Sequence, residues 1–158
     1  MNQNQRKVRR IVVHCSAGPA AQKADAIVSY HTLPVARGGR GWKAPGYHYI
    51  VEADGKVVPV LSEERVANGA KGFNADSIHL CYTGGILPSG KGGDTRTPAQ
   101  KAAIAALVAD IRRRRGKLPV TGHRDLSPDR NGDGRITPDE WIKICPGFDA
   151  AAEYSQSV

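Results

Sequence analysis

The stretch of residues 121–149 constrains the chain more than any other, because it joins a histidine, a cation-loop pattern, a lysine and a cysteine in one segment. The apolar run before it ends in a glycine, which predicts that His123 follows directly on a buried strand. Near its other end, Pro146 favours an extended backbone at Cys145, so Lys143 and Cys145 should point to the same side. Because sites gather where strands end in loops, we predict a functional site in this stretch.

Residues 129–140, DRNGDGRITPDE, match the spacing of a calcium-binding loop. Oxygen ligands recur at alternate positions, a glycine stands at the sharp turn, and a carboxylate closes the loop, as a hard cation of calcium's size requires. The predicted ligands are the side chains of Asp129, Asn131, Asp133 and Glu140 and the backbone carbonyl of Arg135. The alternative is a polar loop closed by its own Asx turns, because Asp, Asn and Gly are also ordinary turn residues.

A regulatory helix–loop–helix sensor is not expected around this loop. Pro128 lies directly before it, and the entering segment 123–128 is a poor helix sequence. We therefore predict a single structural clip that holds the path of the chain between His123 and Cys145.

The length of 158 residues suits one domain with a sizeable core. A hydrophobic content of 40% and a charged content of 24% are typical of a soluble globular protein. No apolar run approaches the roughly 20 residues of a membrane-spanning helix. The basic segment 1–10 leads straight into a strand-like sequence without a long apolar stretch, so we expect no secretion signal.

The net charge of +8 and the pI near 9.7 predict an anionic partner, which can be nucleic acid, acidic lipid or an anionic wall polymer. Charge alone does not choose among these. The cysteines Cys15, Cys81 and Cys145 are odd in number and irregularly spaced, which argues against a disulfide framework and favours synthesis in a reducing compartment.

Helix and strand patterns are interspersed along the chain. Strands are predicted at 8–15, 47–52, 57–61, 77–83 and 118–122, and helices at 25–33 and 98–115. The second helix begins with a capping box of Thr97 and Gln100 and presents apolar residues at helical spacing, so one of its faces should pack on a sheet. An Asp-Gly turn joins two strands as a hairpin, which requires antiparallel neighbours. We predict a single α/β domain with a central mixed β-sheet flanked by helices and the calcium-loop-like insertion near its C-terminus.

Three further local expectations concern the loops and the hairpin. The basic, glycine-rich segment 35–46 is either a rim that grips substrate or a merely solvated loop. The segment 84–96 is also glycine-rich and is predicted to be disordered. In the hairpin, Tyr47 and Tyr49 should share one face and His48 the other, so only one of these two sets can face a site.

Histidines at strand ends suggest a metal centre. His14 and His123 both come at the ends of predicted strands, and Cys145 lies in an extended segment returning from the calcium-like loop. Two imidazoles and one thiolate, with a fourth position left open, are typical of a catalytic rather than a structural zinc site. Lys143 would then stabilise a developing oxyanion. From these residues alone, a set of unrelated structural histidines is the open alternative.

Several dispersed motifs also carry a family resemblance, which extends from residue 11 to residue 149. They are VVHCSA around His14, GYHYIV around Tyr47, AKGFNADSI at 70–78, GGI at 84–86, the TPAQ helix start, GHRD at 122–125 and KICPGFD at 143–149. With these motifs in this order, the chain resembles the zinc-dependent N-acetylmuramoyl-L-alanine amidases of the type 2 amidase and peptidoglycan recognition protein family, and most of all the small bacteriophage lysozymes within it. The resemblance implies one amidase catalytic domain, 1–158, with its core at about 8–150.

The resemblance implies a site and a reaction. The family's zinc ligands match His14, His123 and Cys145, and its catalytic tyrosine and lysine match Tyr47 and Lys143. The implied reaction is attack by zinc-activated water on the amide that joins the lactyl group of N-acetylmuramic acid to L-alanine in peptidoglycan. Lys143 and Tyr47 would hydrogen-bond the oxyanion or relay a proton, and which of them acts as base is left open.

The resemblance also implies a phage or prophage endolysin, a monomer made in the bacterial cytoplasm that acts on the cell wall after release or export. Anionic cell-envelope polymers are further expected partners, and calcium is a second expected cofactor. One departure is that the shortest family members connect the histidine and cysteine ligands by only a few residues, whereas here the calcium-like loop intervenes.

Two other function classes compete with the hydrolase. Some relatives bind peptidoglycan without cutting it, and many of these have lost the cysteine ligand, so the presence of Cys145 favours the enzyme. The other is a basic protein that binds nucleic acid or a polymerase. No residue argues for that role, and we expect no nucleic-acid partner.

Overall fold

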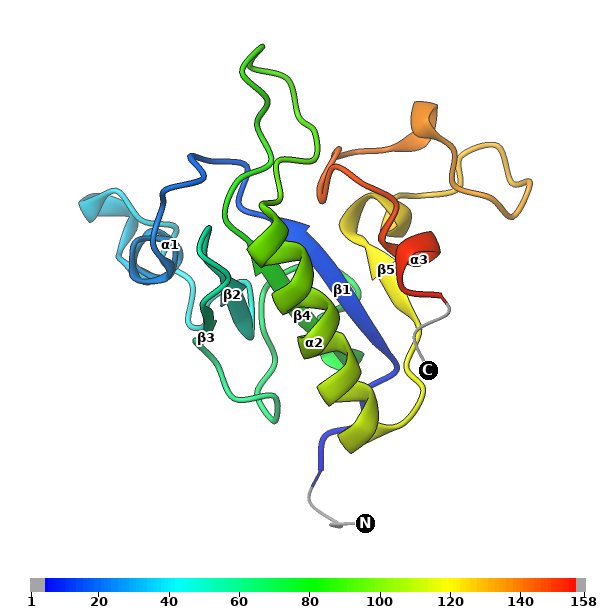
Figure 1. Ribbon diagram of the computed structural model, residues 1–158, viewed down its shortest axis with the longest axis horizontal. Coiled ribbons are helices and arrows are strands. Elements are labelled where there is room, and N and C mark those ends of the chain that lie inside the picture. Colours follow the sequence, from blue (N-terminus) through cyan, green and yellow to red (C-terminus); the bar gives the residue numbers. More distant parts are fainter. Residues whose placement is uncertain (1–4, 156–158) are drawn as a thin grey trace.

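Five strands form a mixed sheet at the centre of the structure, a computed structural model that describes residues 5–155 (Figure 1). They are β1 (Arg10–Cys15), β2 (Tyr49–Val51), β3 (Val57–Pro59), β4 (Ser77–Tyr82) and β5 (Val120–Gly122), in the order β3-β2-β4-β1-β5. All neighbours run parallel except β2 and β3, which form the antiparallel hairpin. The predicted mixed sheet is therefore confirmed, and β3, which contains a proline, lies at the edge of the sheet as such a strand should.

Along the described residues 5–155, three helices and four short turns complete the fold. They are α1 (Ala24–Thr32), α2 (Pro98–Arg115) and α3 (Ala150–Glu153), with 3-10 turns η1 (Val35–Arg37), η2 (Asn74–Asp76), η3 (His123–Leu126) and η4 (Pro138–Glu140). The capping box at the start of α2 is present, since Thr97 Oγ1 accepts the Gln100 N–H at 3.0 Å and the Gln100 side chain accepts the Thr97 N–H at 2.9 Å. Within residues 5–155, none of the helices has both the length and the apolar character needed to cross a bilayer.

The main hydrophobic core lies between α2 and one face of the sheet (Figure 1). Because side chains alternate along a strand, every second residue of β1 and β4 faces α2. The buried residues that pack together there include Ile11, Val13, Ile78, Leu80 and Tyr82 from the strands and Ile104, Val108 and Ile111 from α2. The apolar face predicted for α2 is thus confirmed.

The opposite face of the sheet packs on α1 through a smaller cluster that includes Ile27 and Cys81. The alternation that turns Val13 and Leu80 toward α2 turns His14 and His79 to this second face. Two imidazoles on neighbouring strands are therefore buried together on this face.

The loop 84–96 is ordered, so the prediction of disorder was wrong. Isolated β-bridges join Gly18 to Gly85 and Ile86 to Gly92. At the far end of the loop, the buried Arg96 forms an ion pair of 2.6 Å with Glu153 and a second ion pair within the loop. Glycine is required at position 85, because a Cβ there would lie 2.4 Å from Cys15 Sγ. The glycines thus serve close packing and tight turns, which sequence composition does not distinguish from disorder.

Tyr47 and Tyr49 do not act as a pair, contrary to the strand alternation that we predicted. β2 begins only at Tyr49, so Tyr47 lies in the irregular segment before the strand and its side chain does not follow the strand alternation. The Tyr47 ring lies 5.0 Å from the His14 ring, whereas the Tyr49 hydroxyl donates a hydrogen bond to Glu63. His48 is fully buried on the same side as His14.

A buried carboxylate ties the C-terminal end of α2 to the loop after β3. Glu63 accepts hydrogen bonds from Arg114 at 2.8 Å, from Arg115 at 2.6 Å and from the Tyr49 hydroxyl at 2.5 Å. Burial alone would raise the pKa of Glu63, but these three donors lower it to about 2. Two of the four arginines that end α2 therefore share this one buried carboxylate.

Replacing this carboxylate should destabilise the fold. We expect Glu63→Gln to lower the free energy of unfolding by about 3 kcal/mol, because two guanidinium groups lose their buried partner. The pKa of Glu63 is depressed in the folded state, so its contribution is full above the unfolded value of 4.5 and is lost as the pH falls toward 2. Urea unfolding at neutral pH measures the change. Glu64→Gln is the matched control, since Glu64 is 43% exposed and should cost less than about 1 kcal/mol; equal losses would contradict this assignment.

Candidate metal centre

Parallel neighbouring strands bring the two predicted histidine ligands together. His14 is the fifth residue of β1 and His123 directly follows β5, and the register pairs Val13 with Gly122. The Nδ1 atoms of His14 and His123 lie 3.2 Å apart. Cys145 approaches from the loop that returns after η4, and its Sγ lies 3.8 Å from Nδ1 of His14. Within the part of the chain that the structure describes, this is the one group of His, Cys, Asp and Glu side chains close enough to share a metal ion, with all three ligand atoms within 4.8 Å of one another.

The two ligand separations that involve His14 fit a tetrahedral zinc ion. Zinc–nitrogen bonds of about 2.05 Å and a zinc–sulfur bond of about 2.3 Å place two nitrogens about 3.3 Å apart and a nitrogen and sulfur about 3.6 Å apart at tetrahedral angles. The separations of 3.2 and 3.8 Å are close to these values. Two nitrogens and one sulfur leave one position for water or substrate, which is the pattern of a catalytic site.

The histidines of the cluster are in the protonation state that a metal requires. Burial lowers the pKa of His14 well below 6.5, and burial together with Lys143 lowers the pKa of His123 to about 4. Both rings are therefore neutral at neutral pH. The neighbouring Cys15 thiol and burial raise the pKa of Cys145, so a cation is needed to displace its proton. The Cys15 backbone N–H points at Cys145 Sγ at 3.2 Å and would stabilise the thiolate.

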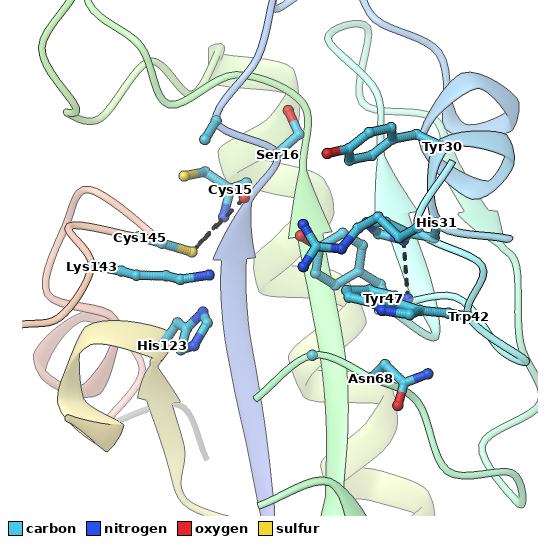
Figure 2. A pocket seen from close by; sticks show the side chains of 14 residues that line it. Cys15, Ser16, Tyr30, His31, Trp42, Tyr47, Asn68, His123, Lys143 and Cys145 are labelled. Carbon is cyan, nitrogen blue, oxygen red and sulfur yellow. Dashed lines mark hydrogen bonds between the residues drawn. The ribbon is translucent and has the colours of Figure 1, made fainter. Parts of the chain in front are cut away.

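Tyr47 and Lys143 flank the cluster (Figure 2). Burial raises the pKa of Tyr47, so its hydroxyl stays protonated and can act as a hydrogen-bond donor. Lys143 is exposed and extends between Cys145 and His123 in the view of Figure 2. Both line a pocket of about 210 Å³ together with His123 and Cys145. The structure therefore brings together all five residues predicted for the zinc centre and its catalysis.

The loop 35–46 forms part of the opposite wall of this pocket (Figure 2). Arg40 lies over the Trp42 ring at 4.6 Å, and both residues line the pocket, so this loop borders it. His31 of α1 was missed by sequence reasoning. Its ring lies 4.8 Å from that of Trp42, and its Nδ1 accepts the Gly46 N–H at 3.1 Å, which fixes the backbone directly before Tyr47.

His79 was also missed, although it is the residue that lies behind His14. Its Nδ1 is 2.8 Å from Nε2 of His14, and both rings are fully buried. Burial lowers the pKa of His79 to about 3, which keeps this ring neutral. The only signal in the sequence was a polar residue in the middle of an apolar strand, SIHLCY, where an unpaired imidazole would be costly.

The calcium-like loop 129–140 closes through its own hydrogen bonds. Asp129 accepts the Gly134 N–H at 2.8 Å, Asp133 accepts the N–H two residues further on at 2.9 Å, and Glu140 accepts the Arg130 N–H at 2.8 Å. Each predicted carboxylate ligand thus already has a backbone donor. These are the contacts of the polar-loop alternative, and they neither require nor exclude a cation.

A histidine in one strand, a second histidine directly after the neighbouring parallel strand and a cysteine from a returning loop define an α/β protein with a candidate His–His–Cys metal site beside a pocket. The family described as N-acetylmuramoyl-L-alanine amidase matches residues 4–147, and the chain belongs to this family.

Relatives of the chain include phage enzymes. It is 30% identical over 140 residues to the endolysin of Klebsiella phage KP32, covering 89% of this chain and 81% of that protein. It is 43% identical over 96 residues to an uncharacterized protein of Haemophilus influenzae, covering 61% of this chain and 83% of the relative. Among solved structures, the Ph2119 endolysin from a Thermus scotoductus bacteriophage has the same fold, with a TM-score of 0.69, 23% identity, and coverage of 99% of this chain and 91% of that one.

Proposed function

We propose that this chain is a peptidoglycan hydrolase that cleaves the amide between N-acetylmuramic acid and the L-alanine of the stem peptide, with a zinc ion held by His14, His123 and Cys145. The observation that carries the proposal is the convergence of these three ligand atoms at the edge of a pocket, in a member of the N-acetylmuramoyl-L-alanine amidase family. The endolysins among its relatives support a phage or prophage endolysin in particular.

A zinc ion in this position supplies Lewis-acid activation of water and of the scissile carbonyl. Lys143 and Tyr47 then stabilise the negative charge that develops on the substrate oxygen. Lys143, which is exposed and reaches between His123 and Cys145, places a positive charge where an oxyanion develops. Tyr47 remains a neutral phenol, so it donates a hydrogen bond to that oxyanion and does not serve as a base.

The pocket wall orients the substrate relative to these groups. Trp42 and Tyr30 offer flat apolar surfaces, and Asn68 and Arg40 offer polar groups that suit the amides and hydroxyls of a glycopeptide. Holding the amide beside the cluster lowers the entropic part of the barrier. The pocket wall thus positions the substrate amide, while Tyr47 and Lys143 stabilise the oxyanion.

A binding module without activity is the alternative. It is disfavoured because both histidines, the cysteine, the tyrosine and the lysine are all present at one site. A nucleic-acid role is disfavoured because Arg114 and Arg115, at the basic end of α2, are paired with Glu63. We propose a monomer that acts on the cell wall after release from the cytoplasm, where its net charge of +8 favours contact with anionic envelope polymers.

Digestion of purified peptidoglycan tests the function. Mass spectrometry should find stem peptides that begin with a free L-alanine amine and glycan strands that carry free lactyl carboxylates. New reducing sugar ends would indicate a glycosidase, and new ends within the stem peptide would indicate a peptidase. Binding to the sacculus without any new ends would identify the chain as a binding module.

We also propose that the loop 129–140 binds calcium as a structural clip. By linkage, calcium at a hundred times its dissociation constant should raise the melting temperature by roughly 5–10 °C. Glu140→Gln removes the closing carboxylate and should abolish the increase. A melting temperature that is the same with calcium and with a calcium-selective chelator would show that the loop is held by its own hydrogen bonds alone.

A further inference from the structure

We propose that His79 is a positioning residue for the metal centre, which holds the far nitrogen of His14 so that Nδ1 of His14 points at His123 and Cys145. This inference rests on the proposed zinc site. It concerns a residue that touches none of the expected substrate groups and acts only through a ligand.

The geometry uses both nitrogens of the His14 ring. Nδ1 faces the cluster, 3.2 Å from His123 and 3.8 Å from Cys145, and Nε2 lies 2.8 Å from Nδ1 of His79. Metal-binding histidines generally donate their second ring N–H to a fixed acceptor, which selects the tautomer and locks the ring plane. In most such sites the acceptor is a carboxylate or a carbonyl oxygen, and here the structure offers a second imidazole.

His79 is itself held rigidly. It lies on β4, between β1 and β2, and its backbone N–H donates to Nδ1 of His48 at 3.0 Å while its carbonyl accepts the His48 N–H at 2.9 Å. The rings of His48 and His79 are parallel within 3°, with centroids 6.0 Å apart. Gly69 leaves the room that the His79 ring needs, because a Cβ there would lie 2.3 Å from Nδ1 of His79. Because these contacts hold the His79 ring in place, that ring can in turn hold the His14 ring.

The hydrogen bonds assign the tautomers. Nδ1 of His48 accepts an amide N–H, so its proton is on Nε2, which donates to the Arg65 carbonyl at 2.9 Å. With Nδ1 of His14 given to a metal, the His14 proton is on Nε2 and is donated to Nδ1 of His79. The His79 proton then lies on Nε2, an atom that has no partner among residues 5–155.

The unpaired Nε2 of His79 indicates that this residue does more than pack in the hydrophobic core. A fully buried imidazole with an unsatisfied nitrogen is unfavourable, and an apolar side chain of similar size would avoid that cost. What the imidazole provides and an apolar residue cannot is the acceptor for Nε2 of His14. We infer that the contact with His14 is the reason for a histidine at this point of β4.

Two substitutions test the inference. His79→Leu removes the acceptor and should weaken zinc binding 10- to 100-fold in competition with a chromophoric chelator. His79→Asn places an amide oxygen close to the former Nδ1 and should recover most of the affinity. Cobalt substituted for zinc should show an altered ligand-field spectrum in His79→Leu and a nearly native one in His79→Asn. Tyr49→Phe, which removes a hydroxyl on the opposite face of the sheet and touches neither His14 nor His79, is the control and should bind zinc normally.

The outcomes separate this inference from the proposed function. If the unaltered protein takes up no zinc, the metal centre itself is rejected. If it binds zinc and His79→Leu binds equally well, or His79→Asn binds as weakly as His79→Leu, only the role of His79 is rejected. If His79→Leu fails to fold, nitrogen NMR of the unaltered zinc-loaded protein decides, since a proton on Nδ1 of His79 would overturn the inference and a proton on Nε2 would support it.

Discussion

Cys145→Ser should abolish the release of muropeptides while leaving the fold intact. Serine is nearly isosteric with cysteine, but its hydroxyl does not ionise to give a zinc ligand at neutral pH. The variant keeps His14 and His123, yet two imidazoles alone hold zinc too weakly for a catalytic site. Because Lewis-acid activation is lost with the metal, we expect activity to fall to less than about a thousandth of the original value.

The measurement combines turnover with metal content. Turbidity loss of purified sacculi gives the rate, metal analysis gives zinc per chain, and circular dichroism reports the fold. The unaltered protein provides the matched control, since stripping with a chelator should remove its activity and added zinc should restore it. Zinc should not restore Cys145→Ser. Full activity in this variant would reject the thiol as a ligand and, with it, the proposed mechanism.

Tyr47→Phe and Lys143→Met should each lower kcat by about 100- to 1000-fold with zinc content unchanged. Each substitution removes one donor to the developing oxyanion and leaves the three ligands in place. The loss should be in kcat rather than in KM, because the interaction that is removed strengthens in the transition state. Tyr47→Phe deletes only a hydroxyl and leaves the ring against His14, 5.0 Å between centroids.

The chain offers a matched control for each substitution. Tyr49→Phe removes the hydroxyl that binds Glu63, on the face of the sheet away from the cluster, and should leave kcat unchanged. Lys117→Met changes an exposed lysine just after α2 and should be equally silent. If Tyr47→Phe and Lys143→Met both kept their full kcat with soluble muropeptide substrate, neither group would stabilise the transition state.

Most of the fold followed from local patterns. The capping box of Thr97 and Gln100 marked the start of α2, the Asp-Gly pair marked the hairpin, and apolar runs marked the strands. Each is a short-range property, since a cap, a turn or a strand depends on neighbouring residues. The prediction failed for 84–96, where the order comes from distant partners such as Gly18 and Glu153.

For the candidate site, the sequence predicted the ligand residues but not how they come together. His14 and His123 were recognised as residues at strand ends, and the family resemblance named them as ligands with Cys145. Their approach to 3.2 Å depends on β5 pairing with β1, which is a matter of strand order. His79 escaped notice because its partner is 65 residues away and local sequence contains no sign of it.

The sequence by itself determined the elements of this protein, its family resemblance and the chemical identity of the candidate metal donors, because these depend on residue types and on short spacings. The tertiary structure alone decided which donors meet, which tyrosine ring lies beside them and which imidazole lies behind them. The physical reason is that strand order and register bring together side chains from β1, β4, β5 and the returning loop, and such long-range pairing leaves no periodic trace in any one segment.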